Sequence, residues 1–443
     1  MTILSQIRAA LQKVLTTVAD AAAQDTGFVR RVRKLTGATF VQTLVWGWLA
    51  EPNATLEELT QTAASVGVSL SPQGLDRRFG PSAARCLQRV LEAAMGEVIQ
   101  SEAAVLPILQ RLAGVYLLDS STIGLPDALA SVWAGCGGSG TTPRAALKVQ
   151  VRWEMKGGGL SGLSLAAGRA HDGSSEGQPA ACARGALRLA DLGYFSLKVL
   201  KALDRDGVYW LSRLQAQCAV FDGSGRRQEV VDWLEENGEE EVELRVQLGE
   251  QERVACRLLA ERVSEGVANQ RRRRLKAEAK RRGQTVSQQR LKRADWTLLV
   301  TNCPAELLSL KEALVLGRVR WQIELLFKLW KSQGKVDEWR SQKPWRILCE
   351  VYAKLLAMVV QHWLLIAGCW QAVDRSLHKG AQTVRKHALH VASGLASGCG
   401  QRLQEALETV VRCLRAGCRM NRRKTQPNTY QLLLALAEKE GLN

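Results

Sequence analysis

Three acidic residues stand at places where the sequence pattern would hold them rigidly. Asp119 and Asp191 each follow a short apolar run, so we expect them at the carboxyl ends of buried strands, and Glu324 lies in a segment with helical spacing. Hard divalent cations such as Mg²⁺ prefer carboxylate oxygens, and a two-metal site needs carboxylates from separate segments. The three residues therefore predict a catalytic centre in which they are the metal ligands.

The segment around Glu324 carries its charges on one side. Helical spacing from residue 307 to residue 332 predicts one long helix, in which Arg320, Lys328 and Lys331 lie at positions i−4, i+4 and i+7 from Glu324. Residues at these intervals share a helix face. A carboxylate between cations suits a metal ion with phosphates on either side, whereas the alternative is a row of surface salt bridges. Apolar residues surround the stripe and favour the functional interpretation.

The composition indicates a folded protein with a polyanionic partner. Of 443 residues, 46% are hydrophobic and 23% are charged, which excludes a wholly disordered or collagen-like chain. The 61 Lys and Arg residues exceed the 43 Asp and Glu residues, so the formal net charge is +18. Because basic side chains that neutralise phosphates release condensed counterions, nucleic acid is the first candidate partner.

Cysteine use and hydropathy predict a protein of the reducing cytosol. The 11 cysteines include no C-x-x-C pair, and the N-terminus lacks the pattern of a secretory signal. The longest apolar stretch, Leu355 to Trp370, contains Gln361 and His362, so we expect a buried helix and no membrane span. No P-loop or dinucleotide fingerprint occurs, which predicts no nucleotide cofactor.

Residues 1–108 have helical spacing and predict an all-helical N-terminal domain. Within it we expect a helix, a turn at Gly67, and a short second helix that begins after Ser71 and carries Arg77 and Arg78. This order is that of a DNA-binding helix-turn-helix, and an ordinary pair of antiparallel helices is the equal alternative.

A second basic cluster in the N-terminal domain is a further candidate for DNA contact. It consists of Arg30, Arg31, Arg33 and Lys34. A solvated helix face would give a similar pattern, so both interpretations stay open.

Short strands alternate with a helix after residue 108 and predict an α/β core. The domain boundaries that we expect are 1–108 for the helical N-terminal domain, 109–220 and 295–345 for the two parts of the core, 221–294 for a β-rich and basic insertion, and 346–443 for a helical C-terminal region.

The predicted insertion has an unusual division of charge. Residues 229–252 hold ten acids and one base, whereas residues 271–293 hold eleven Lys and Arg and one acid. We expect strands in the first half and a basic helix, interrupted near Gly283, in the second. The basic half would follow phosphates, and the acidic half would be a mask or a solvated strand face. A solvent-exposed charged hairpin is the alternative.

Three separated blocks resemble one family of enzymes. The segment Arg320-Trp321-Gln322-Ile323-Glu324, with Phe327, Lys328 and Lys331, resembles the Y-x2-R-x3-E-x6-K signature of the insertion-sequence-four family of DDE transposases. The stretches Leu-Leu-Asp119-Ser-Ser-Thr-Ile and Asp191-Leu-Gly-Tyr-Phe agree with two further blocks of that family, in family order. The resemblance covers at least Val115 to Arg346.

The resemblance implies a fold and a reaction. The fold would be α/β, with an RNase H-like catalytic core, a β-rich insertion, and all-helical N- and C-terminal domains. Asp119, Asp191 and Glu324 would bind two Mg²⁺ ions, with Mn²⁺ able to replace them, and the reaction would be phosphoryl transfer. The enzyme would cut double-stranded DNA at the terminal inverted repeats of an insertion sequence and join the ends to target DNA.

The resemblance also implies roles for other residues and a mode of assembly. Arg320, Lys328 and Lys331 would hold DNA phosphates, and Trp296 would stack on a flipped-out base unless it is an ordinary core residue. The N-terminal domain would bind the repeats, and the C-terminal helices would pair two copies in a synaptic homodimer. We expect a bacterial cytosolic, nucleoid-associated protein.

One position departs from the family signature. Gly317 stands where the signature has Tyr, so the chain lacks that ring and hydroxyl, and Trp321 is a neighbour that can compensate. Gly317 keeps one alternative open, a catalytically impaired transposase derivative that binds the repeats without cutting. A structure-selective nuclease on the same fold is a further alternative, against which the large insertion and the N-terminal domain argue.

Overall fold

A computed structural model describes residues 2–31, 34–102, 107–137, 142–171, 182–372 and 374–421, and the pairs 431–432 and 435–436. The chain forms two compact units. Unit 1 comprises Met1–Val105, Leu118–Ala180 and Gln322–Tyr430, and unit 2 comprises Leu106–Leu117, Ala181–Trp321 and Gln431–Asn443.

The N-terminal part of unit 1 is helical, as the sequence predicts. Thr36 and Thr55 begin two of these helices with reciprocal capping hydrogen bonds, and Ser71 accepts a hydrogen bond from the Gly74 amide at 3.0 Å, with Pro72 at the first helical position. The helices are α1 (Ile3–Gln12), a π-helical turn (Lys13–Val18), α2 (Ala19–Asp25), α3 (Gly37–Ala50), α4 (Leu56–Ser65), α5 (Pro72–Asp76) and α6 (Pro81–Gly96).

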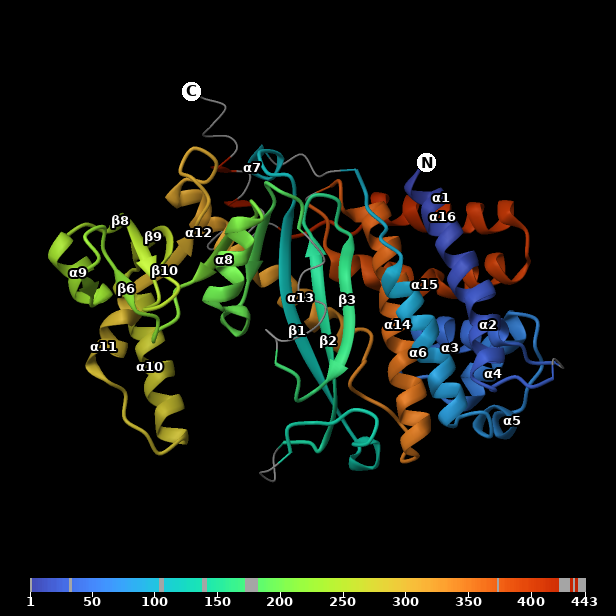
Figure 1. The fold of residues 1–443 in the computed structure, drawn as a ribbon. Coiled ribbons are helices and arrows are strands. Elements are labelled where there is room, and N and C mark those ends of the chain that lie inside the picture. The colour runs from blue at the N-terminus through green and yellow to red at the C-terminus, as the bar shows by residue number, and fades with distance from the viewer. Residues whose placement is uncertain are drawn as a thin grey trace. The chain divides into compact units, whose positions relative to one another are not determined.

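A second set of helices in unit 1 comes from the C-terminal part of the chain. It contains α13 (Trp321–Ser332), α14 (Pro344–Cys369), α15 (Leu377–Ala396) and α16 (Gly400–Ala416). Helix α14 runs between α3, α6, α15 and α16, and every residue from Ile347 to Cys369 is buried (Figure 1). The end of the predicted helical C-terminal region, after residue 421, lies largely outside the described residues.

Helix α14 is the one described helix that is long and apolar enough to cross a membrane. All of its apolar window is buried inside the protein, as the sequence predicts for a core helix. Two of its buried polar residues have partners: His362 Nε2 lies 2.7 Å from the Gly158 carbonyl oxygen, and Lys354 forms an ion pair with Glu350 at 2.8 Å.

Unit 1 contains most of β1 (Val115–Leu125) together with β2 (Ala145–Glu154) and β3 (Leu160–Ala167). Strands β2 and β3 are antiparallel, with Val149 opposite Leu165, and the strand order is β3-β2-β1. Helix α6 packs against β3, so the N-terminal helices and these strands share one hydrophobic core.

Unit 2 contains the start of β1 and the remaining strands, in the order β1-β4-β5-β10-β9-β8-β6-β7. The sheet of unit 2 is mixed, because β4 and β5 are parallel whereas β5, β10, β9 and β8 are antiparallel in succession. The strands are β4 (Leu187–Ala190), β5 (Tyr209–Arg213), β6 (Val220–Phe221), β7 (Arg227–Gln228), β8 (Glu241–Leu248), β9 (Val254–Arg262) and β10 (Trp296–Thr301).

The helices of unit 2 are α7 (Pro107–Gln110), α8 (Leu197–Arg205), α9 (Val230–Asn237), α10 (Glu265–Arg281), α11 (Gln288–Lys292) and α12 (Leu310–Val319). Strand β8 alternates between exposed and buried residues: Glu241 and Glu243 face solvent, and Val242 and Val246 face the core. The acidic half of the predicted insertion therefore includes a solvated strand face.

Two predicted elements are wrong in their limits. Asp119 does not end a strand, because β1 continues through the Ser-Ser-Thr-Ile run to Leu125, and at its end buried Ile123 and Leu125 alternate with exposed Thr122 and Gly124. The long helix predicted from residue 307 to residue 332 is two helices, α12 and α13, which meet at Arg320.

Candidate active site

Asp119 lies inside β1, in the part of that strand that belongs to unit 1. Its carboxylate is half-buried, and its Oδ1 accepts a hydrogen bond from the Ser120 amide at 2.8 Å. Leu117 and Leu118 before it are buried, so the apolar start of β1 fixes the backbone while the acidic side chain reaches the surface.

Glu324 lies in the first turn of α13, also in unit 1. The buried face of α13 consists of Ile323, Leu326, Phe327, Leu329 and Trp330. Glu324, Lys328 and Lys331 share the opposite face, as the spacing predicts: Glu324 is half-buried and Lys328 is exposed. Lys331 donates a hydrogen bond to the Thr122 carbonyl oxygen at 3.3 Å, which ties this face of α13 to β1.

Asp191 directly follows β4 in unit 2, as predicted. Its backbone carbonyl begins a short 3₁₀ turn, Leu192–Tyr194, and its Oδ1 lies 3.5 Å from Arg320 Nη1. The Arg320 side chain is only 9% exposed and that of Asp191 is 44% exposed. Arg320 therefore does not continue the α13 stripe, and its guanidinium orients the carboxylate of Asp191.

The three acids are divided between the units: Asp119 and Glu324 belong to unit 1 and Asp191 belongs to unit 2. Among the described residues no group of three or more His, Cys, Asp and Glu side chains is arranged to hold a metal ion. The chemistry of each acid nevertheless fits a divalent cation, because all three are partly exposed carboxylates. A carboxylate beside a guanidinium, such as that of Asp191, keeps further acceptor positions. The metal triad stays a prediction.

The two tryptophans predicted to contact DNA differ in exposure. Trp296 is 4% exposed in the hydrophobic core of unit 2, and the Arg262 guanidinium lies 5.9 Å from its ring centroid. Trp296 thus occupies the position of an ordinary core residue, which was the alternative to stacking on a flipped-out base. Trp321 is 47% exposed at the start of α13, four residues before the exposed Leu325.

The predicted basic clusters of the N-terminal helices lie outside helices. Arg30, Arg31 and Lys34 are exposed in the connection between α2 and α3, and Arg33 lies outside the described residues. Arg77 and Arg78 are also exposed, but they follow α5, which ends at Asp76. The second helix therefore ends one residue earlier than the expectation that it carries both arginines: Arg77 is its C-cap, with its amide donating to the Gln73 carbonyl oxygen at 3.1 Å, and Arg78 follows.

Gly317, at the position of the signature tyrosine, lies inside α12 against β10. A Cβ atom at this position would stand 3.3 Å from Leu299 Cδ1 and 3.7 Å from its Cδ2. The absence of a side chain therefore allows α12 to approach the strand closely.

Sequence reasoning missed a buried ion pair in α14. Lys354 and Glu350, with side chains 1% and 3% exposed, form an ion pair inside α14, and Lys354 Nζ also donates to the carbonyl oxygens of Lys335 and Glu338 at 3.2 and 2.7 Å. Burial raises the pKa of Glu350 and lowers the pKa of Lys354. A Glu and a Lys four residues apart in an otherwise apolar helix were the available signal.

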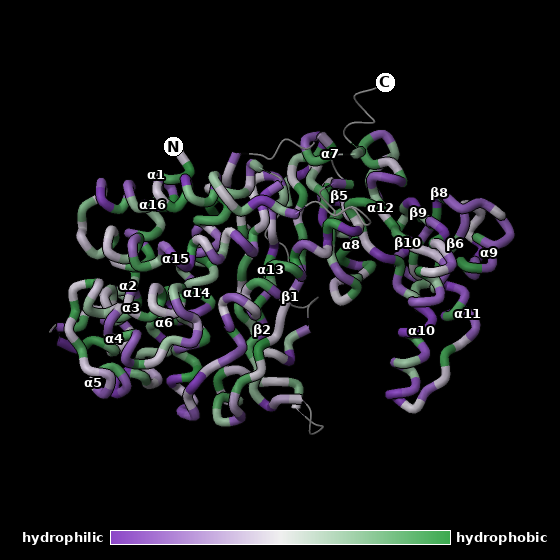
Figure 2. The backbone as a smooth tube through the Cα atoms, turned by 180° about the vertical axis from the view of Figure 1, so that it is seen from behind, coloured by the Kyte–Doolittle hydropathy of each residue, from purple (hydrophilic) through white to green (hydrophobic). Residues whose placement is uncertain are grey.

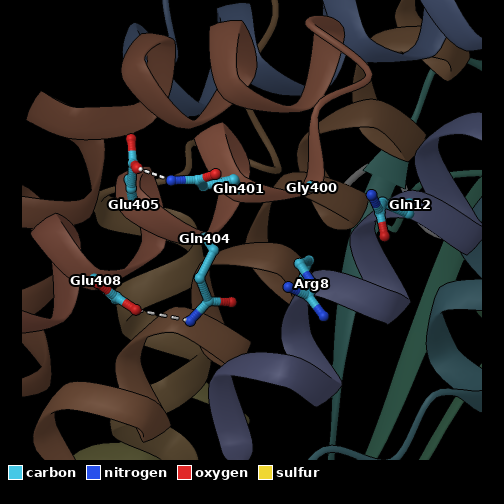
Figure 3. A pocket seen from close by; sticks show the side chains of 7 residues that line it. All are labelled: Arg8, Gln12, Gly400, Gln401, Gln404, Glu405 and Glu408. Atoms are coloured by element: carbon cyan, nitrogen blue, oxygen red, sulfur yellow. Dashed lines mark hydrogen bonds between the residues drawn. The ribbon is translucent and has the colours of Figure 1, made fainter.

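A groove of about 630 Å³ lies between α1 and α16 in unit 1, and Figure 3 shows its polar lining. Gln401 and Gln404 donate to Glu405 and Glu408 at 3.1 and 3.0 Å, one turn along α16, and Arg8 faces them from α1. None of the predicted site residues lines this groove.

The three acids lie in a part of the chain that is similar to known proteins. A family model described as Transposase DDE domain matches residues 110–360, which include Asp119, Asp191 and Glu324. The transposases for insertion sequence elements IS231B and IS231C of Bacillus thuringiensis subsp. berliner are 26% and 27% identical to the chain, over 76% of this chain and 75% of each relative. The transposase for element IS1151 of Clostridium perfringens is 23% identical over 76% of both chains.

The protein is thus an enzyme of the phosphoryl-transfer class, with a DDE domain that spans more than half of the chain. It belongs to the insertion-sequence-four family of DDE transposases, which confirms the resemblance of the three sequence blocks. Enzymes of this family act on DNA and in general use divalent metal ions.

Proposed function

We propose that this transposase cuts double-stranded DNA at the terminal inverted repeats of its insertion sequence and joins the freed ends to target DNA. The observation that carries the proposal is the family match over residues 110–360, which contains the three carboxylates in family order. Strands β1 to β5, with the antiparallel β2–β3 pair and the parallel β4–β5 pair, would be an RNase H-like core, and the segment from β6 to α11 would be its insertion.

Asp119, Asp191 and Glu324 would hold two Mg²⁺ ions, which Mn²⁺ can replace. When bound, such ions supply an activated oxygen nucleophile and stabilise the departing oxygen of the scissile phosphate. Residues of the chain would position these ligands. Arg320 would orient the Asp191 carboxylate, and Lys331 ties α13 to β1 at Thr122, three residues after Asp119.

Lys328 would contact a DNA phosphate, since it is exposed one helical turn from Glu324. Trp321, exposed at the start of the same helix, offers a ring for stacking on a base and would take the place of the tyrosine that Gly317 replaces. The exposed cations Arg30, Arg31, Lys34, Arg77 and Arg78 would contact the repeats. We further propose a synaptic homodimer in the bacterial cytosol, associated with the nucleoid.

The experiment that tests the proposal is cleavage of a labelled duplex that carries the end of the element. The wild type should cut at the element boundary with Mg²⁺ or Mn²⁺, and cutting should stop in excess EDTA. Glu324→Gln should lower the cleavage rate by more than about 100-fold, because even the outer partners of metal ligands contribute 10- to 100-fold.

Glu338→Gln is the matched control for this experiment. Glu338 is an acid in the segment that follows α13, is 57% exposed, and pairs only with Lys335 among the described residues. This variant should cut like the wild type. If Glu324→Gln cuts as fast as Glu338→Gln, the assigned metal ligand is wrong. If the wild type binds the duplex but never cuts it, the proposed reaction is wrong.

A further inference from the structure

Helix α10 is attached to the sheet of unit 2 by two of its arginines. Arg271 donates to the Trp296 carbonyl oxygen at 2.9 Å and to Thr297 Oγ1 at 3.1 Å, and Arg272 forms an ion pair with Asp295. The small residues Ala268 and Ala279 are the buried positions of the helix. These contacts fix which side of α10 faces the protein.

The opposite side of α10 carries five exposed cations. At 100° per residue, Arg273, Lys276 and Lys280 fall in one stripe, and Arg274 and Arg281 fall in the adjacent stripe. Within the described part of the chain, the side chains of these five residues have no hydrogen bond and no ion pair. We call these five residues the α10 cation face.

Acidic residues elsewhere in unit 2 do not neutralise this face. Asp232 and Glu235 of α9 pair with Lys292 of α11 at 3.2 and 2.9 Å. Glu243 of β8 pairs with Arg257 at 2.7 Å, and Glu241 lies 3.7 Å from Lys311. These four acids of the predicted insertion pair with cations outside α10.

The α10 cation face also extends away from its own sheet. Figure 1 shows α10 leading away from β8, β9 and β10, so that its C-terminal end lies farthest from those strands, and Figure 2 shows the helix as predominantly hydrophilic. From Arg273 to Arg281 the helix advances about 12 Å. A duplex carries one phosphate charge per roughly 1.7 Å of its axis, so several phosphates fall within reach of this length.

We propose that the α10 cation face binds the backbone of duplex DNA without reading its sequence, as a contact separate from recognition of the element's ends. The inference rests on the proposed function, since it assigns a second contact with the same substrate. Long Arg and Lys side chains that no neighbour holds in place suit phosphates better than base edges, because base reading needs a fixed donor geometry.

The test measures the affinity of the full-length protein for a random-sequence duplex by fluorescence anisotropy. The variant replaces the α10 cation face with glutamine: Arg273→Gln, Arg274→Gln, Lys276→Gln, Lys280→Gln and Arg281→Gln. Five phosphate contacts contribute about 4.5 to the slope of log affinity against log salt. The slope of the variant should fall by about 3 to 4.5, and its affinity at low salt should fall more than tenfold.

The control carries the same change in net charge on exposed residues of unit 1: Arg85→Gln, Lys386→Gln, Arg402→Gln, Arg412→Gln and Arg415→Gln. Its slope should change by less than about 1. Equal losses in the two variants would mean a general charge effect and would overturn the inference, as would an unchanged slope in the α10 variant. Far-ultraviolet circular dichroism verifies that both variants are folded.

A further arm separates this inference from the proposed reaction. Glu324→Gln should keep the wild-type affinity for the random duplex while it loses cleavage. Failure of cleavage in the wild type would thus refute the proposed function without changing the slopes, whereas failure of the slope prediction refutes only the role of α10.

Discussion

Replacing the buried Lys354 by methionine should destabilise unit 1 more than any single change of an exposed charge. Methionine fills a similar volume, but it leaves the Glu350 carboxylate buried and unpaired and removes the donor to two backbone carbonyl oxygens. Breaking a buried ion pair by removing one partner costs about 3 to 5 kcal/mol. We expect Lys354→Met to lower the free energy of opening of α14 by that amount.

Hydrogen exchange of the α14 backbone amides measures this quantity in the full chain, because the most protected amides report the opening of the core. Lys343→Met is the matched control: Lys343 pairs with Asp76 at 2.6 Å, but its side chain is 67% exposed. An exposed pair contributes about 0 to 1 kcal/mol, so the control should exchange almost like the wild type.

The double variant Glu350→Leu/Lys354→Met separates the two parts of the cost. It removes the stranded carboxylate, so it should be more stable than Lys354→Met alone. The carbonyl oxygens of Lys335 and Glu338 still lose their donor, at about 1 to 3 kcal/mol each, so it should not exceed the wild type. Should Lys354→Met exchange like Lys343→Met, the ion pair does not hold α14 and the reasoning is refuted.

Two further predictions concern unit 1 and unit 2 separately. Burial lowers the pKa of His362 from 6.5 to about 4, so between pH 6.5 and pH 4 the unfolded chain binds a proton that the folded chain does not, and the free energy of unfolding falls by about 3 kcal/mol as the pH falls through this window. His362→Gln should reduce the pH dependence of the unfolding free energy in this window, and an unchanged profile would contradict the assignment. Gly317→Tyr should lower the melting temperature, because overpacking against Leu299 costs about 1 to 3 kcal/mol. Adding Leu299→Ala should restore part of the lost melting temperature, whereas a Gly317→Tyr variant as stable as the wild type would show that α12 does not need to approach β10 closely.

The sequence predicted strands in the core and in the insertion. Short strands were expected after residue 108 and in the first half of the insertion, and the structure has β1 to β5 and β8 in these places. Alternation of apolar and polar residues, or a short apolar run between turns, is a local signal, so it predicts a strand even when the strands that pair with it are unknown. The motif blocks likewise identified the family.

The remaining features depend on contacts between distant residues. The break between α12 and α13 leaves no clear local signal, because no proline stands near Arg320 and the helical spacing of apolar residues continues through it. The ion pair of Arg320 with Asp191 joins positions that are far apart in the chain. The burial of Lys354 and the core position of Trp296 depend on packing, which residue type alone does not determine.

The pairing of β9 with β10 limits how the polypeptide can be redesigned. Six consecutive residues of β10, from Trp296 to Thr301, pair with β9. Strand β9 belongs to the segment between β5 and β10, which in the sequence looks like an insertion that could be removed. Excising that segment would turn β10 into an open edge with buried Leu298 and Val300 beside it, and an apolar edge strand recruits other chains. A shortened version would therefore aggregate, whereas trimming only β6, β7 and α9, beyond β8, leaves the β10 edge covered.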